Sequence, residues 1–307
     1  MQGVLSGFFV IGVVVGVGYL MAQLGVFTEQ AQNLLGTLSF YVAMPVLFVT
    51  LMAGQDVGAV LSVDLVASLV SIGATVLLWV ASARLIWRMP LGETVAGSFA
   101  SAYVNAGNLG LPIATYVLGS PTRAVPVMLT QLLFLQPVGL ALLDLSTGTE
   151  ARFTIRAFVS RFLRNPLTIA TLVGVLLSVT GTRIPPLLAA PMSMVGAMAV
   201  PGVLMAFGIS LCLGPRPDRA GGPMLAWQTG LKLVAMPLVA WAFGRFAMHL
   251  GHEDLLAVTV MAGLPTAQNV FVIATRYDTG VVMVRDAIFV TTVLSVLSIF
   301  GIAALLS

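Results

Sequence analysis

The chain has 307 residues, of which 59% are hydrophobic and only 8% are charged, and its formal net charge at pH 7 is +3. A soluble protein of this length would carry roughly a quarter charged residues. The composition therefore excludes a water-soluble domain and predicts an all-α polytopic protein that lies in the lipid bilayer. The arginines are spread over short loops and form no patch, so the positive charge does not indicate a nucleic-acid partner.

Windows of about 20 apolar residues, the length that crosses roughly 30 Å of hydrocarbon, predict ten transmembrane helices. In chain order these spans cover residues 4–22, 31–53, 65–87, 93–119, 123–144, 166–181, 187–212, 224–249, 253–278 and 283–305. The first segment has no basic region before it and no small-residue cleavage site after it. We therefore predict a spanning helix there and not a signal peptide.

The arginines predict the orientation in the membrane, because inner loops carry more of them than outer loops. With an external N-terminus, the inner loops and helix ends hold Arg84, Arg88, Arg152, Arg156, Arg161, Arg164, Arg216, Arg219, Arg276 and Arg285. The outer ones hold only Arg123, Arg183 and Arg245. This bias predicts that both termini lie on the periplasmic or external side, and we expect a bacterial inner (plasma) membrane.

A polar segment divides the chain into two sets of five spans. Residues 146–165 carry four arginines and read as a cytoplasmic linker between a first repeat, 1–145, and a second, 166–307. An odd number of spans per half means opposite insertion, so the halves are predicted to form a 5+5 inverted repeat. Two landmarks recur at nearly the same spacing: Pro45 with Pro201, and Pro112 with Pro265.

Two polar, glycine- and proline-bearing interruptions lie inside the fourth and ninth spans. They are Asn105-Ala-Gly-Asn-Leu-Gly-Leu-Pro112 and Gly263-Leu-Pro-Thr-Ala-Gln-Asn269. An unpaired backbone group in hydrocarbon costs several kcal/mol, so a broken helix persists only where it faces protein or a cavity. A matched pair of breaks in opposite halves is typical of secondary transporters. The competing interpretation is that these residues only kink the helices and hold them together.

If the two breaks cross near the middle of the membrane, they form one binding site. Half-helix N-termini there present free N–H groups and a positive dipole end, which suit a carboxylate. Amide oxygens at Asn105, Asn108 and Asn269 could also coordinate Na⁺, so coupling to Na⁺ or H⁺ stays open. No metal centre and no cofactor are predicted. The candidate substrate-binding residues at the breaks are Asn105, Gly107, Asn108, Gly110, Pro112, Pro265, Thr266, Gln268 and Asn269.

Two further polar residues inside spans are candidates for the same site. Gln131 in the fifth span either faces the cavity or packs against a neighbouring helix. Lys232 lies inside the eighth span, where an ionisable residue is a functional candidate by default. It either attracts an anion or replaces a coupling cation, unless it snorkels to the interface.

Other titratable residues have simpler interpretations. Asp286 next to Arg285 reads as an interfacial ion pair, with titration during transport as the alternative. His249 and His252 lie with two acidic residues at an outer loop, where a solvated turn explains them without a metal.

The fourth-span motif and the Gly-Leu-Pro of the ninth span resemble the auxin efflux carrier family, which includes plant PIN carriers and bacterial permeases for malate or malonate. The resemblance implies a fold similar to bile-acid and sodium/proton transporters, with helices 4 and 9 broken and crossed. It also implies a scaffold domain from helices 1, 2, 6 and 7 and a transport domain from helices 3–5 and 8–10 that moves as an elevator. The family's crossover prolines fall on Pro112 and Pro265, and its substrate-contacting asparagine region falls on Asn105 and Asn108.

We therefore predict a secondary active transporter of small organic anions, mono- or dicarboxylates such as malonate or malate. The long hydrophilic loop of the plant members is missing, which makes a small carboxylate the better expectation than auxin. The alternatives are cation-coupled transport of a bile-acid-like or auxin-like amphipathic anion, and a non-transporting membrane sensor. The sequence contains no catalytic grouping of residues, so we do not predict an enzyme. Gly12 and Gly16 form a GxxxG face that either packs within the chain or forms a homodimer through the scaffold domain.

Overall fold

The computed structural model describes residues 2–53, 63–146, 166–214 and 222–306. These residues form helices throughout, joined by short turns and one isolated β-bridge. Six of the arginines used to predict the orientation, between Arg152 and Arg219, lie outside the described residues, as does most of the predicted linker.

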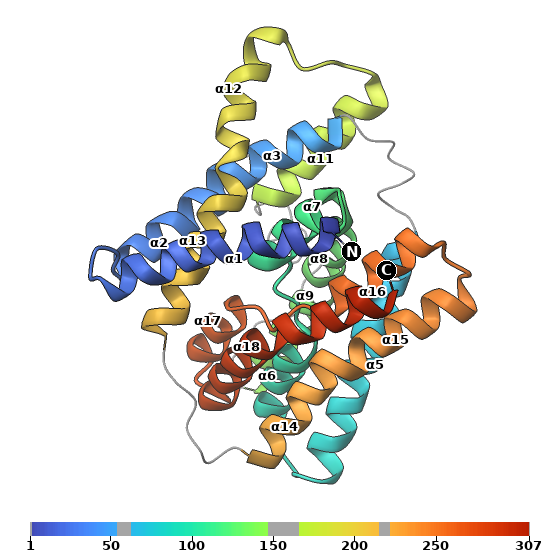
Figure 1. Ribbon diagram of the computed structural model, residues 1–307. Coiled ribbons are helices and arrows are strands. Elements are labelled where there is room, and N and C mark those ends of the chain that lie inside the picture. The colour runs from blue at the N-terminus through green and yellow to red at the C-terminus, as the bar shows by residue number, and fades with distance from the viewer. Residues whose placement is uncertain (1, 54–62, 147–165, 215–221, 307) are drawn as a thin grey trace.

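The described residues of the first half of the chain form five helical regions, some of them built from several segments (Figure 1). They are α1 (Gln2–Gln23); α2 (Glu29–Leu38), the π-turn η1 (Ser39–Ala43) and α3 (Met44–Ala53); α5 (Val63–Leu85); α6 (Leu91–Ala102), η2 (Ala106–Gly110) and α7 (Leu111–Tyr116); and η3 (Pro121–Ala124), α8 (Val125–Thr130), η4 (Gln131–Leu135) and α9 (Gln136–Ser146).

The second half has a similar succession of helices. They are α11 (Pro166–Thr180); α12 (Pro186–Ala197) and α13 (Ala199–Leu213); α14 (Gly222–Gly230), η6 (Leu231–Ala235), α15 (Met236–Ala242) and η7 (Phe243–Ala247); α16 (His252–Ala262) and α17 (Asn269–Arg276); and α18 (Val281–Leu306). Interrupted helices therefore occur at the positions of the fourth and ninth predicted spans.

Five helical stretches among the described residues are long and apolar enough to cross a membrane: Glu29–Ala53, Asp64–Leu85, Pro186–Leu213, Gly222–Ala247 and Val281–Leu306. The other predicted spans coincide with shorter or interrupted helices. The prediction of an all-helical protein with membrane-spanning helices is therefore confirmed by helix length and composition. The ten-span inverted repeat stays a prediction.

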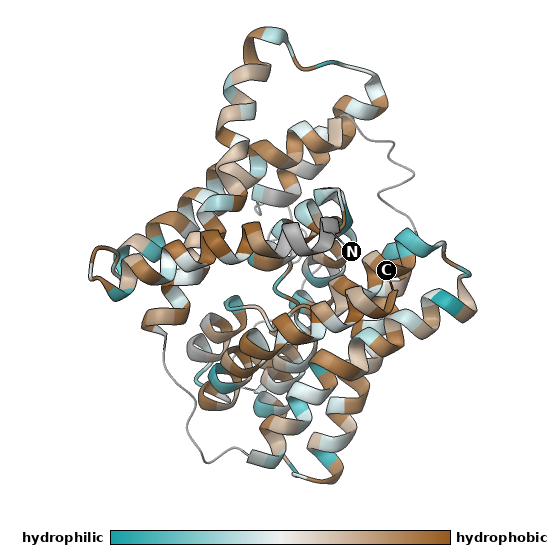
Figure 2. Ribbon diagram, in the orientation of Figure 1, coloured by the Kyte–Doolittle hydropathy of each residue, from teal (hydrophilic) through white to brown (hydrophobic). Residues whose placement is uncertain are grey.

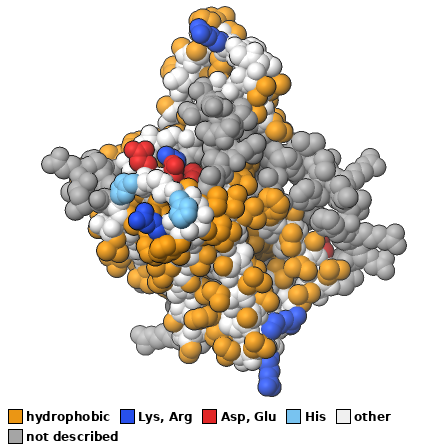
Figure 3. Space-filling model, turned by 90° about the vertical axis from the view of Figure 1, so that its right-hand side faces the viewer, with side chains coloured by type: hydrophobic (Ala, Val, Ile, Leu, Met, Phe, Trp, Pro, Cys, Tyr) orange, Lys and Arg blue, Asp and Glu red, His pale blue; other side chains and the backbone are white. Residues whose placement is uncertain are grey.

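The outer surface is apolar, as a lipid-facing surface must be. Figure 2 shows hydrophobic residues along most helices and hydrophilic ones near their ends, and Figure 3 shows broad hydrophobic areas on one face. Leu187 and Leu305 are both 86% exposed. Such exposure would be unfavourable in water and is the natural result of burial in hydrocarbon.

The helices pack in two groups. In the first group α1 lies along α13, α2 also contacts α13, and α3 packs against α11 and α12. In the second group α5 packs on α6, α8 and α15, α6 packs on α9, and α16 and α17 pack on α18. The groups touch where α1 meets α7 and α13 meets η2, which is beside the break in the fourth predicted span.

Proline does not open the helix where the sequence suggested it. Pro45, Pro112, Pro137 and Pro237 each occupy the second residue of the helix that follows a π-turn. A proline lacks the N–H and clashes with the carbonyl four residues earlier, and a wide turn relieves that clash. The break predicted over residues 105–112 therefore lies further toward the N-terminus, at residues 103–105, and the chain is helical from Ala106 through Pro112.

Candidate functional site

The two breaks are in direct contact. Val104 and Thr266 form an antiparallel β-bridge. The N–H of Asn105 donates to the carbonyl of Pro265 at 2.8 Å, and the N–H of Ala267 donates to the carbonyl of Tyr103 at 3.0 Å. Each unwound segment thus satisfies backbone groups of the other, which is what a break inside hydrocarbon requires. We call this contact, residues 103–105 with 263–268, the crossing.

Close approach at the crossing depends on small residues. A methyl group at Gly110 would lie 3.0 Å from Cδ1 of Leu264, and one at Gly263 would lie 2.6 Å from Cδ1 of Ile302. Glycine at these positions lets the two breaks and α18 pack against one another. Gly107 differs, because a methyl group there would meet nothing within 4 Å.

Side chains at the crossing divide into a buried set and an accessible set. Asn105 and Thr266 are 3% and 0% exposed. Asn108 is half-buried, as are Gly107 and Gln268, and Asn269 is exposed. The amide of Gln268 donates to the hydroxyl of Ser210 on α13 at 2.7 Å, so the accessible side of the crossing faces the first helix group.

Two helix N-termini begin at the crossing, those of η2–α7 and of α17. The side chain of Asn105 accepts the N–H of Asn108 at 3.2 Å and so caps η2. The N–H groups of Gly107, Gln268 and Asn269 have no acceptor among the described residues. Free N–H groups at a helix start attract anions.

Two helix C-termini end at the crossing, and both receive donors. The amino group of Lys232 donates to the carbonyl of Ala262, the last residue of α16, at 3.0 Å and also contacts the sulfur of Met236. The hydroxyl of Thr266 donates to the carbonyl of Ala100 near the end of α6 at 2.5 Å. The negative ends of these helices are therefore compensated within the protein, whereas the positive ends are not.

Lys232 and Gln131 support the crossing from behind. Lys232 is fully buried, and its contacts are to the end of α16 and to Met236. The side chain of Gln131 is 3% exposed and accepts the N–H of Val104. Both residues thus hold the broken backbone, and this removes them from the part of the site that a substrate could reach.

One buried donor at the crossing has no partner. The amide nitrogen of Asn105 is buried and without a hydrogen bond among the described residues. Leaving such a group unpaired costs about 1–3 kcal/mol. The nitrogen is therefore available to a bound group.

The remaining candidates lie away from the crossing. Asp286 is 3% exposed and forms the predicted pair with Arg285, at 2.7 Å, whereas its position at the membrane interface stays a prediction. His249 and His252 belong to no group of three potential metal ligands among the described residues. Figure 3 shows both histidines beside acidic and basic side chains at one edge of the molecule.

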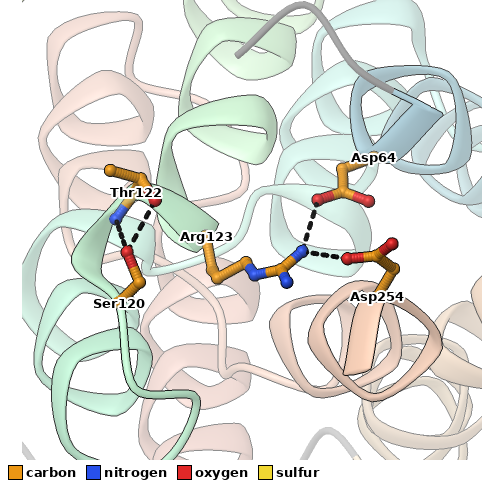
Figure 4. Close-up of polar contacts among 5 residues, drawn as sticks. All are labelled: Asp64, Ser120, Thr122, Arg123 and Asp254. Atoms are coloured by element: carbon orange, nitrogen blue, oxygen red, sulfur yellow. Dashed lines mark hydrogen bonds and ion pairs between the residues drawn. The ribbon is translucent and has the colours of Figure 1, made fainter. Parts of the chain in front are cut away.

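An ion triad joins three elements of the second helix group (Figure 4). Arg123 of η3 contacts Asp64 at the start of α5 at 3.4 Å and also pairs with Asp254 of α16. The sequence identified Arg123 only as an outer-loop residue. Its partners are far apart in the chain, so no local pattern could have revealed them.

Several residues that build the crossing were not predicted. Tyr103 and Val104 provide the broken backbone itself, Ser210 holds Gln268, and the hydroxyl of Thr291 accepts the N–H of Thr266 at 3.1 Å. Apolar residues at a break carry no distinctive sequence signal. The roles of Ser210 and Thr291 depend on tertiary packing.

Comparison with known proteins gives consistent similarities over nearly the full chain. Residues 6–136 and 149–303 match the model of a family described as "Membrane transport protein". A Rhizobium meliloti protein named "Putative malonate transporter" is 29% identical over 301 residues, covering 94% of this chain and 91% of the relative.

Two further relatives have similar coverage. A Methanothermobacter thermautotrophicus protein named "Uncharacterized transporter" is 27% identical over 296 residues, with 94% of this chain and 93% of the relative covered. Escherichia coli "Uncharacterized transporter YfdV" is 25% identical over 275 residues, with 87% and 86% covered.

Proposed function

Because the chain belongs to the family of membrane transport proteins that includes the auxin efflux carriers, we propose that it is a secondary transporter of small organic anions. The family and the names of the relatives indicate a transport protein and not an enzyme. The proposed substrates are mono- and dicarboxylates such as malonate or malate. The relative named for malonate supports this substrate class.

The charge balance at the crossing carries the proposal. The N–H groups of Gly107, Gln268 and Asn269 have no acceptor in the described part of the chain, and they lie at the positive ends of two helices. The negative ends are already occupied by Lys232 and Thr266. A guest that carries negative charge is therefore favoured at this position, because it accepts charge-assisted hydrogen bonds from the backbone N–H groups.

Asparagine side chains set the orientation of the guest in this proposal. Asn108 is half-buried, and Asn105, three residues before it, has an amide nitrogen without a partner among the described residues. Amide nitrogens donate to carboxylate oxygens without adding charge. Such contacts favour a short dicarboxylate over a bulky amphipathic anion.

Lys232 takes the place of a coupling cation in the same proposal. When protonated, its amino group brings a positive charge to the C-terminus of α16, where a bound Na⁺ would otherwise balance the helix end. Transport then needs no Na⁺. The earlier expectation of a Na⁺ near Asn105, Asn108 and Asn269 is the alternative that the uptake experiment below decides.

The two helix groups suggest how access alternates. We assign the group of α1–α3 and α11–α13 to the scaffold and the group that holds the crossing to the moving transport domain. The crossing lies where η2 and α7 touch α13 and α1, so a sliding motion would carry the bound anion along the scaffold. The bond between Gln268 and Ser210 joins the two groups and must break as they slide.

Three further features stay proposals. The protein is placed in a bacterial inner membrane with both termini outside. The halves are proposed to be inverted repeats. A homodimer is proposed through the scaffold, because methyl groups at Gly12 and Gly16 would meet nothing within 4 Å in the single chain, which leaves that face of α1 open.

Uptake of labelled malonate into proteoliposomes tests the function. We expect saturable uptake by the wild-type protein with equal rates in NaCl and choline chloride, and at least a tenfold loss in Asn108→Ala. The matched control is Asn33→Ala, which makes the same change at an exposed position of α2.

The outcomes separate the alternatives. Uptake that requires Na⁺ would contradict the role of Lys232 and leave the transporter assignment intact. Saturable binding of malonate without accumulation would support a membrane sensor. Equal uptake by Asn108→Ala and Asn33→Ala, with both variants folded, would refute the binding site.

A further inference from the structure

A cavity lies at the opposite end of α6 from the crossing. It opens to the surface, has a volume of about 510 Å³ and is lined by the start of α6, by α14 and by the turn that leads from α17 into α18. Nine residues of α6 separate Glu93 at the cavity from Ala102 at the break, which is about 14 Å along a helix. The cavity is therefore separate from the site proposed for the carboxylate.

A buried amide without a partner among the described residues lines this cavity. Gln228 of α14 lines it and is 0% exposed. Neither the amide oxygen nor the amide nitrogen of Gln228 has a hydrogen bond among the described residues. Two unpaired polar atoms at one buried position are costly, so this amide is explained best by something that occupies the cavity.

Three carboxylates line the same cavity. Asp286 pairs with Arg285, whereas Glu93 and Asp278 form no ion pair among the described residues. Two carboxylates without an ion pair among the described residues, the half-buried Glu93 and the exposed Asp278, thus line the same cavity as the amide. The lining favours a positive charge.

The chain geometry holds the two free carboxylates at one rim. A methyl group at Gly92 would lie 2.9 Å from the hydroxyl of Thr279, so the start of α6 and the α17–α18 turn are in close contact. The turn itself is tight, with positive φ values of 47° at Asp278 and 61° at Gly280. Glu93 follows Gly92 in the chain, and Asp278 precedes Thr279.

The rest of the lining is apolar and adaptable. It includes Met89, Met224 and Met283, together with Leu225 and Val281. Methionine side chains adjust to the shape of a guest. An inorganic cation would gain nothing from these walls, whereas an organic one would bury its hydrocarbon part.

We propose that this cavity binds an ammonium group attached to a small apolar body, between the amide of Gln228 and the carboxylates of Glu93 and Asp278. The ammonium donates to the amide oxygen and to the carboxylates, and the apolar body lies against the methionines. The amide nitrogen donates to a water, for which a cavity of this volume has room.

Titration of the purified protein with n-butylammonium chloride, followed by calorimetry, tests the site. We expect one saturable site, no binding of the uncharged n-butanol, and at least a tenfold weaker affinity in Glu93→Gln and in Gln228→Met, because each change removes one charge-assisted hydrogen bond. Gln228→Met keeps the side-chain volume and removes an unpaired buried amide, so it is expected to fold.

The controls make the same changes at exposed positions of α2, in Glu29→Gln and Gln30→Met. Absence of saturable n-butylammonium binding, or equal affinity in Glu93→Gln and Glu29→Gln, would overturn the proposal. The carboxylate site is tested separately. Asn108→Ala should bind n-butylammonium like the wild type, so the failure of one site does not imply the failure of the other.

The natural ammonium group could belong to a free amine or to a phosphatidylethanolamine headgroup, and a second arm of the experiment separates the two. If the headgroup occupies the cavity, n-butylammonium should bind more weakly in phosphatidylethanolamine nanodiscs than in phosphatidylglycerol nanodiscs. Equal affinity in the two lipids assigns the site to a free amine.

Discussion

Substitution of Gly107 by alanine tests the proposed position of the anion, because it separates binding from folding. The added methyl group would meet nothing within 4 Å, and Gly107 lies in the helical turn η2 without a positive φ. Alanine is favoured over glycine inside a helix by roughly 0.5–1 kcal/mol. The variant is therefore expected to be as stable as the wild type or slightly more stable.

Binding is expected to change in the opposite direction. The space in front of Gly107 is where the proposal places a carboxylate oxygen, next to the free N–H. A methyl group there blocks that contact, and a lost hydrogen bond to a charged group costs about 1.5–3 kcal/mol. This corresponds to roughly a 10- to 100-fold weaker affinity for malonate.

Calorimetry with malonate and thermal unfolding of the same sample measure both effects. Gly36→Ala in α2 is the matched control, because a methyl group there also meets nothing within 4 Å. If Gly107→Ala binds malonate as tightly as Gly36→Ala does, the anion does not lie at η2 and the reasoning is refuted.

Two further substitutions test the helix ends at the crossing. Thr266→Val leaves the carbonyl of Ala100 without its donor and should lower the free energy of unfolding by about 1–2 kcal/mol. The control is Thr75→Val, because the hydroxyl of Thr75 bonds within α5, and this change should lower the free energy of unfolding by less. Equal losses of the two variants in unfolding experiments would contradict the role of Thr266. Lys232→Met removes the donor to Ala262 and should weaken malonate binding at least tenfold in choline chloride. In NaCl the affinity should partly recover, because Na⁺ can then balance the end of α16. Unchanged affinity in calorimetry would show that the lysine is not a substitute cation.

The sequence was sufficient to find the two breaks but not to place them to the residue. Asn105, Gly107 and Gly110 are poor helix formers, so an interruption in the fourth span could be predicted. Its actual position, at residues 103–105, is set by contact with the other broken segment around Thr266, which no local preference encodes.

The continuation of the helix through Pro112 was not predicted, for a similar reason. A proline disrupts a regular α-helix, but the π-turn η2 before it widens the backbone enough to continue into α7. The contacts of Gln131, Gln268 and Lys232 could not be predicted, because each of them joins helices that are distant in the chain. The buried amide of Gln228 gave no signal either, since one polar residue in an apolar helix has many ordinary explanations.

Competition between malonate and malonamide tests the central claim most directly, because the two molecules share their shape and differ in charge. If uncompensated helix N-termini at the crossing bind the substrate, one malonate binds per chain, and malonamide competes at least 100-fold more weakly. If malonamide displaces malonate at comparable concentrations, recognition does not rest on negative charge and the account is wrong.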